Sequence, residues 1–256
     1  MFVTANDGCR LHVQEGRAAN VPLVMSNSLG TDMGLWDAQL PALGRDSTWR
    51  YDTRGHGQSD APISEYSVDR LGEDLLSVID ATGAPQVDVC GLSIGGVTAL
   101  WAAIHHPARI RRLILANTAA RIGDLDLWAE RIGKVRAGGL SVLAEATMQR
   151  WFTAGFRSAY PQAVDRIRST LLQTSVDGYV GCCAALRDAD LRAEVNQVSC
   201  PTLVIVGAHD PATPPQAGEW LAANIAGAVL VSLDAAHLSN VERTDEFNAA
   251  VKAFLA

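Results

Sequence analysis

The sequence predicts an α/β fold with a mostly parallel sheet of eight strands, helices on both faces of the sheet, and a helical cap inserted after the sixth strand. Short runs rich in Val, Leu and Ile alternate with segments of helical period along most of the 256 residues. Continuous apolar strands between amphipathic helices are typical of a parallel sheet that is covered on both faces. One long stretch contains only helical segments, and it therefore predicts the cap.

The expected elements follow one another along the chain. The first two strands lie on either side of Asn6, Asp7 and Gly8, which tolerate the positive φ of a tight hairpin turn. The alternation then stops between residues 121 and 190. The chain thus divides into a core of residues 1–120 and 191–256 and a helical cap of residues 121–190. Apolar strands are expected at 21–26, 49–52, 87–90, 113–116, 202–207 and 229–233, and helices at 36–43, 68–81, 97–105 and about 242–255.

Composition and charge exclude several classes of protein. With 48% hydrophobic and 19% charged residues, the chain is able to bury a large core without metals or disulfides. Its net charge of −7, from 21 Lys and Arg against 28 Asp and Glu, argues against binding to the phosphates of a nucleic acid. The five cysteines lack the C-x-x-C spacing of zinc and redox sites, and there is no apolar run of about 18 residues. We therefore expect a reduced, cytoplasmic protein that holds no metal and binds neither membrane nor nucleic acid.

The strongest motif is Gly91-Leu92-Ser93-Ile94-Gly95-Gly96, which follows an apolar strand and opens a helix. Glycines two residues before and after a serine permit the sharp strand-to-helix turn that exposes a nucleophilic hydroxyl at the top of a sheet. The bare pattern also arises by chance, so its position between strand and helix is what makes it specific. Ser93 is therefore the candidate nucleophile.

A serine nucleophile needs a base, and six histidines compete for that role. His237 lies between the last strand and the last helix, where the chain returns to the carboxyl edge of the sheet, whereas His209 follows its strand too early. Asp210 precedes Pro-Ala-Thr-Pro-Pro, which holds its carboxylate in a loop. The chain order matches a catalytic triad of Ser93, Asp210 and His237. Asp234, three residues before His237, is the second candidate for the acid.

Acyl transfer also requires donors for the developing oxyanion. The N–H of Ile94 is one candidate, because this residue follows the nucleophile at a helix N-terminus. The other is the N–H of Leu29 in the loop Ser26-Asn27-Ser28-Leu29-Gly30, where the glycine lets the backbone approach a ligand closely. The loop at 52–59, Asp-Thr-Arg-Gly-His-Gly-Gln-Ser, is expected to be scaffold, with structural contacts for His56.

These motifs together resemble the α/β-hydrolase superfamily along essentially the whole chain, and thus imply the α/β-hydrolase fold. More narrowly, the sequence resembles the 3-oxoadipate enol-lactonases in blocks that lie in both core and cap. The blocks are Ser26-Asn27-Ser28-Leu29-Gly30-Thr31, Ala116-Asn117-Thr118-Ala119-Ala120-Arg121-Ile122, Arg150-Trp151-Phe152-Thr153, Gly181-Cys182-Cys183-Ala184-Ala185-Leu186-Arg187-Asp188, and the segments around Asp210 and His237.

The resemblance implies hydrolysis of 3-oxoadipate enol-lactone to 3-oxoadipate in the β-ketoadipate pathway of aromatic catabolism, with no cofactor. A protein of charge −7 repels such a small anionic lactone unless a local cation offsets the charge. The cap carries nine Lys and Arg against eight Asp and Glu, a net +1, whereas the rest carries 12 against 20, a net −8. We expect Arg131, one turn from Trp128 on a cap helix, to bind the substrate carboxylate. Ser28 is also expected at the substrate, and Trp151 as an apolar wall over the lactone ring.

Two other interpretations stay open at this point. The same fold also serves esterases, other lactonases and cofactor-free perhydrolases with different substrates. A non-catalytic receptor for a small molecule would keep the fold and the pocket, although an intact nucleophile, acid and base argue against it. The sequence does not distinguish attack by serine from direct attack by water, and it leaves the oligomeric state open.

Overall fold

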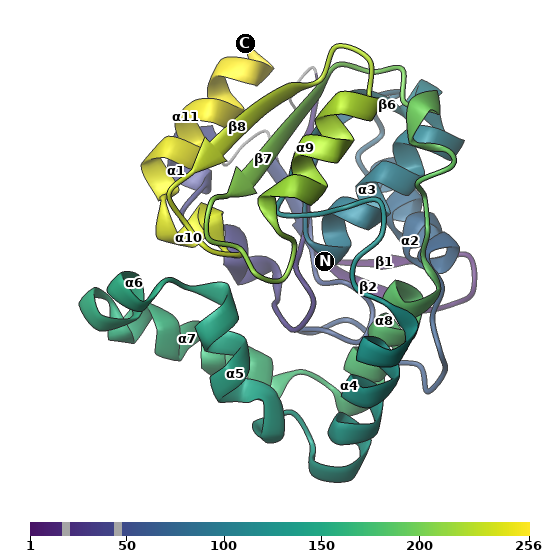
Figure 1. The fold of residues 1–256 in the computed structure, drawn as a ribbon. Helices are drawn as coiled ribbons and strands as arrows, with labels where there is room; N and C mark the ends of the chain where they lie inside the picture. The colour runs from purple at the N-terminus through teal and green to yellow at the C-terminus, as the bar shows by residue number, and fades with distance from the viewer. Residues whose placement is uncertain (17–20, 44–47) are drawn as a thin grey trace.

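The sheet has eight strands in the residues that the computed structural model describes, namely 1–16, 21–43 and 48–256 (Figure 1). Its order from edge to edge is β1-β2-β4-β3-β5-β6-β7-β8. β1 pairs antiparallel with β2, and β2 with β4, while every later pair is parallel, which confirms the mostly parallel sheet. The strands are β1 (Phe2–Thr4), β2 (Arg10–Gln14), β3 (Leu23–Ser26), β4 (Thr48–Tyr51), β5 (Val87–Leu92), β6 (Ile110–Ala116), β7 (Thr202–Gly207) and β8 (Val229–Leu233).

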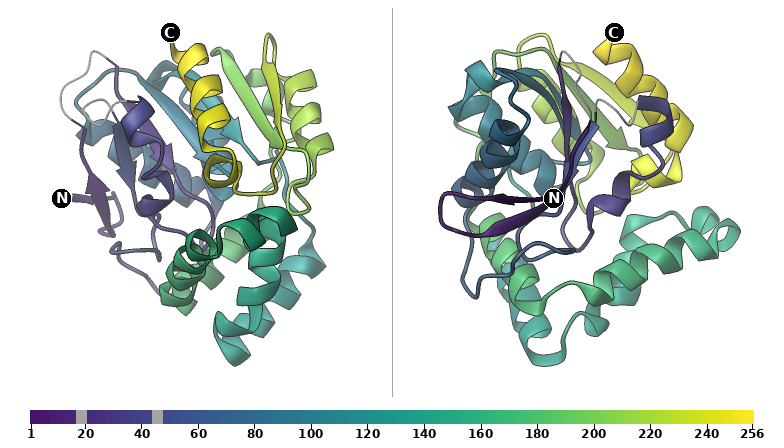
Figure 2. Two further views of the ribbon diagram at one scale, coloured as in Figure 1. Left: turned by 90° about the vertical axis from the view of Figure 1, so that its left-hand side faces the viewer. Right: turned by 180° about the vertical axis from the view of Figure 1, so that it is seen from behind.

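Helices cover both faces of this sheet. α2 and α3 lie on one face, and α1 and α11 lie on the other (Figure 2). In α2 the hydroxyl of Ser67 caps the first turn by accepting a hydrogen bond from the N–H of Arg70, and one apolar side is buried in the core. The α-helices outside the segment between β6 and β7 are α1 (Leu40–Leu43), α2 (Val68–Ala81), α3 (Ile94–His105), α9 (Pro215–Asn224), α10 (Ser239–Glu242) and α11 (Thr244–Leu255).

The chain between β6 and β7 forms helices without a strand, as expected for residues 121–190. These helices lie beyond the carboxyl ends of the strands (Figure 1). Asp124, Thr153 and Ser175 begin three of them by accepting a backbone hydrogen bond on the side-chain oxygen. The division into core and cap stays a prediction. The helices are α4 (Leu125–Gly138), α5 (Ser141–Trp151), α6 (Ala154–Ala159), α7 (Pro161–Gln173) and α8 (Val176–Asp188).

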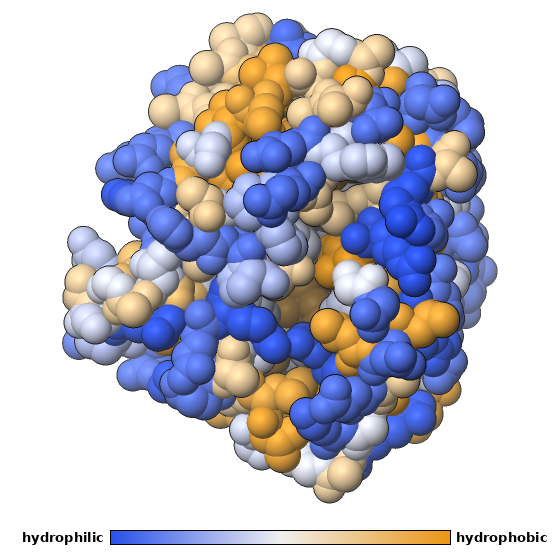
Figure 3. Space-filling model, viewed as in Figure 1, coloured by the Kyte–Doolittle hydropathy of each residue, from blue (hydrophilic) through white to orange (hydrophobic). Residues whose placement is uncertain are grey.

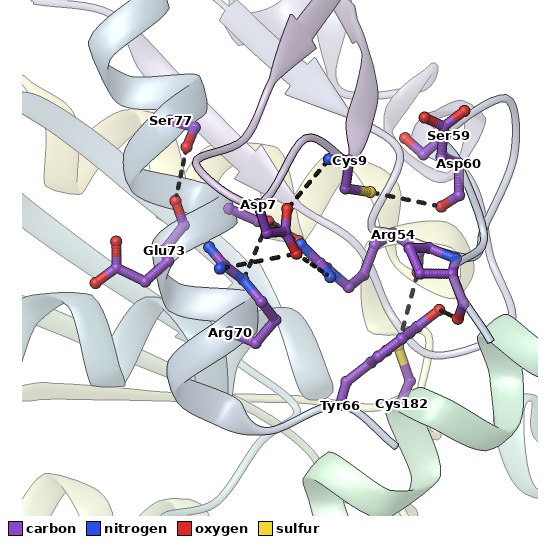
Figure 4. A network of polar contacts seen from close by, with 12 residues as sticks. Asp7, Cys9, Arg54, Ser59, Asp60, Tyr66, Arg70, Glu73, Ser77 and Cys182 are labelled. Atoms are coloured by element: carbon purple, nitrogen blue, oxygen red, sulfur yellow. Dashed lines mark hydrogen bonds and ion pairs between the residues drawn. The ribbon is translucent and has the colours of Figure 1, made fainter. Parts of the chain in front are cut away.

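The loop at 52–59 makes scaffold contacts through its first part: residues 52–56 are buried, whereas Gly57 and Gln58 are exposed. Arg54 binds Asp74 of α2 through Nε at 2.5 Å and Nη2 at 2.6 Å, and its Nη1 lies 3.0 Å from Asp7. Figure 4 shows Asp7 between Arg54 and Arg70, with Cys182 of α8 against the backbone of Arg54. The charged network therefore joins the hairpin, the loop and α2, and the Cys182 thiol ties α8 to the same loop.

One expected element differs from the structure. Instead of a helix at 36–43, the chain forms a 3-10 turn at Met33–Trp36 and the single turn of α1. The carboxylate of Asp32 accepts from the N–H of Gly34 and starts the turn early. Pro41 then interrupts a continuous helix, because it has no N–H to donate to the preceding turn. No helix in the described part of the chain is long and apolar enough to cross a membrane.

Candidate active site

Ser93 lies at the sharp turn between β5 and α3, with a φ of 58° and a ψ of −119°. The glycines around it are required by close approach of the backbone. A Cβ atom on Gly91 would lie 2.2 Å from the carbonyl oxygen of Gly95, and one on Gly95 would lie 2.3 Å from that of Ser26. The turn therefore brings Ser93 next to the end of β3 and presents its hydroxyl at the carboxyl edge of the sheet.

His237 and Asp210 form a buried pair, with Nδ1 of the imidazole 2.8 Å from Oδ2 of the carboxylate. Four further donors hold this carboxylate: the N–H groups of Ala212 and Thr213, the hydroxyl of Thr213 and the amide of Asn117. Burial raises the pKa of Asp210, but the charge of His237 and these hydrogen bonds outweigh burial and place the pKa below its usual value. An ionised Asp210 accepts a hydrogen bond from Nδ1–H of His237, which leaves Nε2 of the imidazole free to accept a proton.

The other two sequence candidates near this pair lie outside it. Nε2 of His209 is 2.8 Å from Oδ1 of Asp234, and Arg243 donates to the same carboxylate at 2.5 Å. The side chains of His209 and Asp234 are exposed by 57% and 68%. They form a surface cluster, so Asp234 does not contact His237 as an orienting acid.

The loop after β3 is fixed against the nucleophile turn. The carbonyl of Asn27 accepts from the N–H of Gly95 at 3.1 Å. Its side chain accepts from the indole of Trp36 at 2.8 Å and donates to the carbonyl of Tyr51 at 2.7 Å. His56 accepts from the N–H of Gly30 at 2.9 Å, which confirms its structural contacts, and burial lowers its pKa.

Two backbone amides in this loop and turn have no acceptor among the described residues. Among the described residues, neither the N–H of Leu29 nor that of Ile94 donates a hydrogen bond within the chain. Leu29 lines the pocket that contains Ser93, whereas Ile94 is the first residue of α3 and is not among the lining residues. Free N–H groups at a helix start and in a tight loop suit an anionic oxygen.

A pocket of about 110 Å³ joins Ser93 and His237 to the helices between β6 and β7. Figure 3 shows a hollow between α4, α5 and the core, with apolar residues inside it. Ser28, Arg131 and Trp151, which the sequence analysis places at the substrate, all line the pocket, and their contact with a substrate stays a prediction. The lining residues are Ser28, Leu29, Ser93, Ile122, Gly123, Leu127, Trp128, Arg131, Arg150, Trp151, Tyr179, Leu186, Pro211, Ala212 and His237.

Two arginines give this pocket a positive charge. Arg131 lies over the ring of Trp128 at 5.1 Å and donates to Tyr179 at 3.4 Å, and Arg150 donates to Thr147 at 3.4 Å. No carboxylate among the described residues lies within 4.0 Å of either guanidinium, and none lines the pocket. Burial, and then the charge of Arg131, lowers the pKa of Arg150.

Sequence reasoning missed Arg150, although it directly precedes Trp151 at the end of α5. Both residues belong to a segment that contacts the histidine loop. The carbonyl of Trp151 accepts from the N–H of Leu238 at 3.1 Å. Glu242 accepts from the N–H of Ala236 at 3.0 Å and from the N–H of Thr153 at 3.3 Å. The pocket wall is thus bonded to the residues on both sides of His237.

The described residues contain no group of three or more His, Cys, Asp or Glu side chains placed to hold a metal ion. The arrangement instead supplies a hydroxyl, an imidazole oriented by a carboxylate, free amides and two cations. These groups suit nucleophilic attack on the carbonyl of an anionic ester or lactone.

Comparisons with known proteins agree with this geometry. Residues 21–244 match the family model described as the alpha/beta hydrolase fold. The chain is 42% identical over 255 residues to 3-oxoadipate enol-lactonase 2 of Acinetobacter baylyi. The matched region covers 99% of this chain and 95% of that protein. The enol-lactonase from Burkholderia xenovorans has a TM-score of 0.96 at 42% identity, covering 100% of this chain and 99% of that one. A hydrolase from Pseudomonas aeruginosa has a TM-score of 0.96 at 44% identity, covering 100% and 98%. The chain is therefore an enzyme of the α/β-hydrolase family and belongs within it to the enol-lactonases.

Proposed function

We propose that this enzyme hydrolyses 3-oxoadipate enol-lactone to 3-oxoadipate in the β-ketoadipate pathway. The observation that carries the proposal is the distribution of charge in the pocket. A serine and a histidine line it with Arg131 and Arg150, and no carboxylate is among the described lining residues. A small lactone with one carboxylate fits this distribution, because its carbonyl meets the serine while its charge meets the guanidinium groups. Relatives that carry the name enol-lactonase support the same substrate.

Ser93 attacks the lactone carbonyl while Nε2 of His237 takes the hydroxyl proton. Asp210 stabilises the imidazolium that forms and keeps the ring in the Nδ1–H tautomer. Collapse of the tetrahedral intermediate breaks the ring C–O bond and leaves the acyl group on Ser93. The released enolate takes the proton from His237 and relaxes to the ketone. Water, deprotonated by His237, then hydrolyses the acyl-enzyme and restores the serine.

The N–H groups of Leu29 and Ile94 stabilise the oxyanion in both tetrahedral intermediates. Each such donor typically contributes about 10²- to 10³-fold in rate. The proposal is supported by the absence of a protein acceptor for either amide in the described chain. Gly30 is held by His56, and this contact fixes the neighbouring N–H of Leu29 before substrate binds.

The remaining contacts orient the substrate. Arg131 and Arg150 bind the carboxylate, Trp151 covers the ring, and Ser28 contacts the substrate beside the oxyanion donors. Residues 121–190 act as the cap, because α4 and α5 supply both arginines while the core supplies the triad. Closing the pocket over the lactone excludes bulk water and strengthens the charge interactions inside it.

A paired assay tests the proposed function. Loss of the ultraviolet absorbance of the enol-lactone measures ring opening, and p-nitrophenyl acetate supplies a neutral ester in parallel. We expect kcat/KM for the lactone to exceed that for the ester by at least about 100-fold, because only the lactone engages the cations. Intact-protein mass spectrometry of quenched reactions should detect an acyl adduct that Ser93→Ala abolishes.

Three results would contradict the proposal. Faster cleavage of the neutral ester would indicate an esterase or perhydrolase of the same fold. Binding of the lactone without turnover would indicate a receptor. Turnover that survives in Ser93→Ala at a tenth of the wild-type rate would indicate direct attack by water.

A further inference from the structure

Asn117 combines a strained backbone with a buried position beside the triad. It follows β6 directly and has a φ of 44°. Among the described residues, Ser93 is the only other non-glycine residue with a positive φ. The N–H of Asn117 donates to the carbonyl of Ile205 on β7 at 2.8 Å, so the neighbouring strand holds this conformation. Strained residues of this kind concentrate at functional sites, and the other residue with this conformation, Ser93, is the candidate nucleophile.

Asn117 is 1% exposed, and its side chain makes three hydrogen bonds. Its Nδ2 donates to Oδ2 of Asp210 at 3.0 Å and to the carbonyl of Ala236 at 3.2 Å. Its Oδ1 accepts from the hydroxyl of Ser239 at 2.5 Å. The orientation of the amide is fixed, because the Ala236 carbonyl and the ionised Asp210 only accept hydrogen bonds.

These contacts surround His237. Asp210 bonds its imidazole, Ala236 precedes it in the chain, and Ser239 follows two residues later. Backbone requirements alone do not explain an asparagine here, since glycine adopts the same φ without strain. A Cβ atom on Gly207 would lie 2.2 Å from the carbonyl oxygen of Ala236 and 2.9 Å from Nδ2 of Asn117, so the neighbouring strand leaves room for both partners of this hydrogen bond.

We propose that Asn117 is a positioning residue, which holds the acceptor oxygen of Asp210 and the loop of His237 in one catalytic arrangement. The inference rests on the proposed triad. The amide of Asn117 acts through both of its polar atoms. Its Nδ2 donates to Oδ2 of Asp210 and stabilises the ionised carboxylate, and its Oδ1 accepts from Ser239 and anchors the loop. In the described chain, the titratable groups that contact this cluster are Asp210 and His237, with Glu242 bonded to the N–H of Ala236.

Asn117→Gly removes the amide and relieves the backbone. We expect kcat for the enol-lactone to fall about 10- to 100-fold, as for loss of one hydrogen bond to a charged group, with KM within about threefold. The acidic limb of the pH–activity profile should move to higher pH. With one donor fewer on Asp210, more negative charge faces the imidazole and favours its protonated, inactive form.

Asn117→Asp keeps the shape of the side chain and is expected to change the alkaline side of the pH–activity profile instead of the acidic side. The introduced carboxyl faces two acceptors and can replace the amide donor only while it carries a proton. Activity should therefore exceed that of Asn117→Gly at low pH and fall as the pH rises, giving an alkaline limb that the wild type lacks. A merely structural role predicts no such limb. Being isosteric, this variant also tests the proposal if the glycine variant does not fold.

Asn248→Ala is the matched control, because Asn248 is a buried asparagine on α11 that bonds the carbonyl of Ala38. It should lower the melting temperature and leave both limbs of the profile unchanged. Unchanged kcat and profile in Asn117→Gly, or an Asn117→Asp profile without an alkaline limb, would overturn the proposal. If the wild type does not open the lactone, the proposed substrate fails instead. The same comparisons then use the rate at which a fluorophosphonate labels Ser93.

Discussion

Replacing Arg150 by Met tests whether the pocket recognises the charge of its substrate. The substitution removes one guanidinium and keeps most of the apolar volume of the side chain. Among the described residues, the side chain of Arg150 has one hydrogen-bond partner, the hydroxyl of Thr147 at 3.4 Å, and burial lowers the pKa of Arg150. A buried cation that has no ion-pair partner in the free protein gains the most interaction energy when a substrate carboxylate binds next to it.

The magnitude follows from one hydrogen bond to a charged group, about 1.5 to 3 kcal/mol. At 1.36 kcal/mol for each factor of ten, KM for the enol-lactone should rise about 10- to 150-fold in Arg150→Met. Arg131→Met should have a smaller effect on KM, because part of its guanidinium is already occupied by Trp128 and Tyr179. That variant also loses a cation–π contact that contributes to stability.

The assay compares initial rates on the enol-lactone and p-nitrophenyl acetate, with Arg166→Met as the control for loss of one positive charge on an exposed part of α7. The control should leave both KM values within about twofold, as expected for a screened surface charge. The melting temperature of ligand-free Arg150→Met should equal or exceed that of the wild type, because repulsion between the two arginines disappears. Equal losses on the charged and the neutral substrate, or a marked fall in melting temperature, would refute carboxylate recognition by Arg150.

Three further predictions concern chemistry and packing. Ser93→Ala should lower turnover by about 10⁴-fold or more and leave the melting temperature within about 2 °C, which activity and calorimetry check. Asp210→Asn should cost about 10⁴-fold because an amide does not stabilise the imidazolium. Since the pKa of Asp210 lies below its usual value, its ionised form stabilises the fold above the unfolded-state pKa, and this stability is lost as the pH falls through the folded-state pKa. Urea titrations at a series of acidic pH values should thus show a shallower loss in this variant than in the wild type. Gly55→Ala should destabilise by about 3 kcal/mol, because its Cβ would lie 2.2 Å from Cα of Gly178 at a φ of 77°. Gly83 has a φ of 70°, and a Cβ atom there would meet no atom of the other described residues within 4 Å, so Gly83→Ala should cost about half as much in the same unfolding experiment.

Elements with a strong periodic pattern could be predicted from the sequence. The helix at 68–81 and the strands at 202–207 and 229–233 have the expected bounds, because a single apolar face or a continuous apolar run determines each of them. The conformation of the segment at 33–43 could not be predicted in this way. There, the carboxylate of Asp32 and the ring of Pro41 decide the conformation, and neither effect shows in hydrophobic periodicity.

The residues of the site likewise differ in how far the sequence alone could identify them. Ser93, Asp210 and His237 each carry local signals, namely flanking glycines, prolines and a position after a strand. Asn117 also follows a strand, but no local signal links it to its partner Asp210, which is 93 residues away. The two meet only because β6 and β7 are adjacent parallel strands whose carboxyl ends share one edge of the sheet. Contacts of this kind arise from topology, so sequence reasoning needs the strand order before it can find them.

The charge of residues 121–190 shows why counting residues could not identify the cations of the pocket. Its nine Lys and Arg exceed its eight Asp and Glu by one, yet two unpaired arginines line the pocket. Carboxylate partners in the described chain neutralise the cations Arg121, Lys134, Arg136, Arg168 and Arg187. Arg157 donates instead to the carbonyls of residues 149 and 152, and Arg166 is exposed. Among the described residues, only Arg131 and Arg150 line the pocket and have no carboxylate within 4.0 Å. The pairing pattern, rather than the net charge, therefore determines where an anionic substrate is attracted.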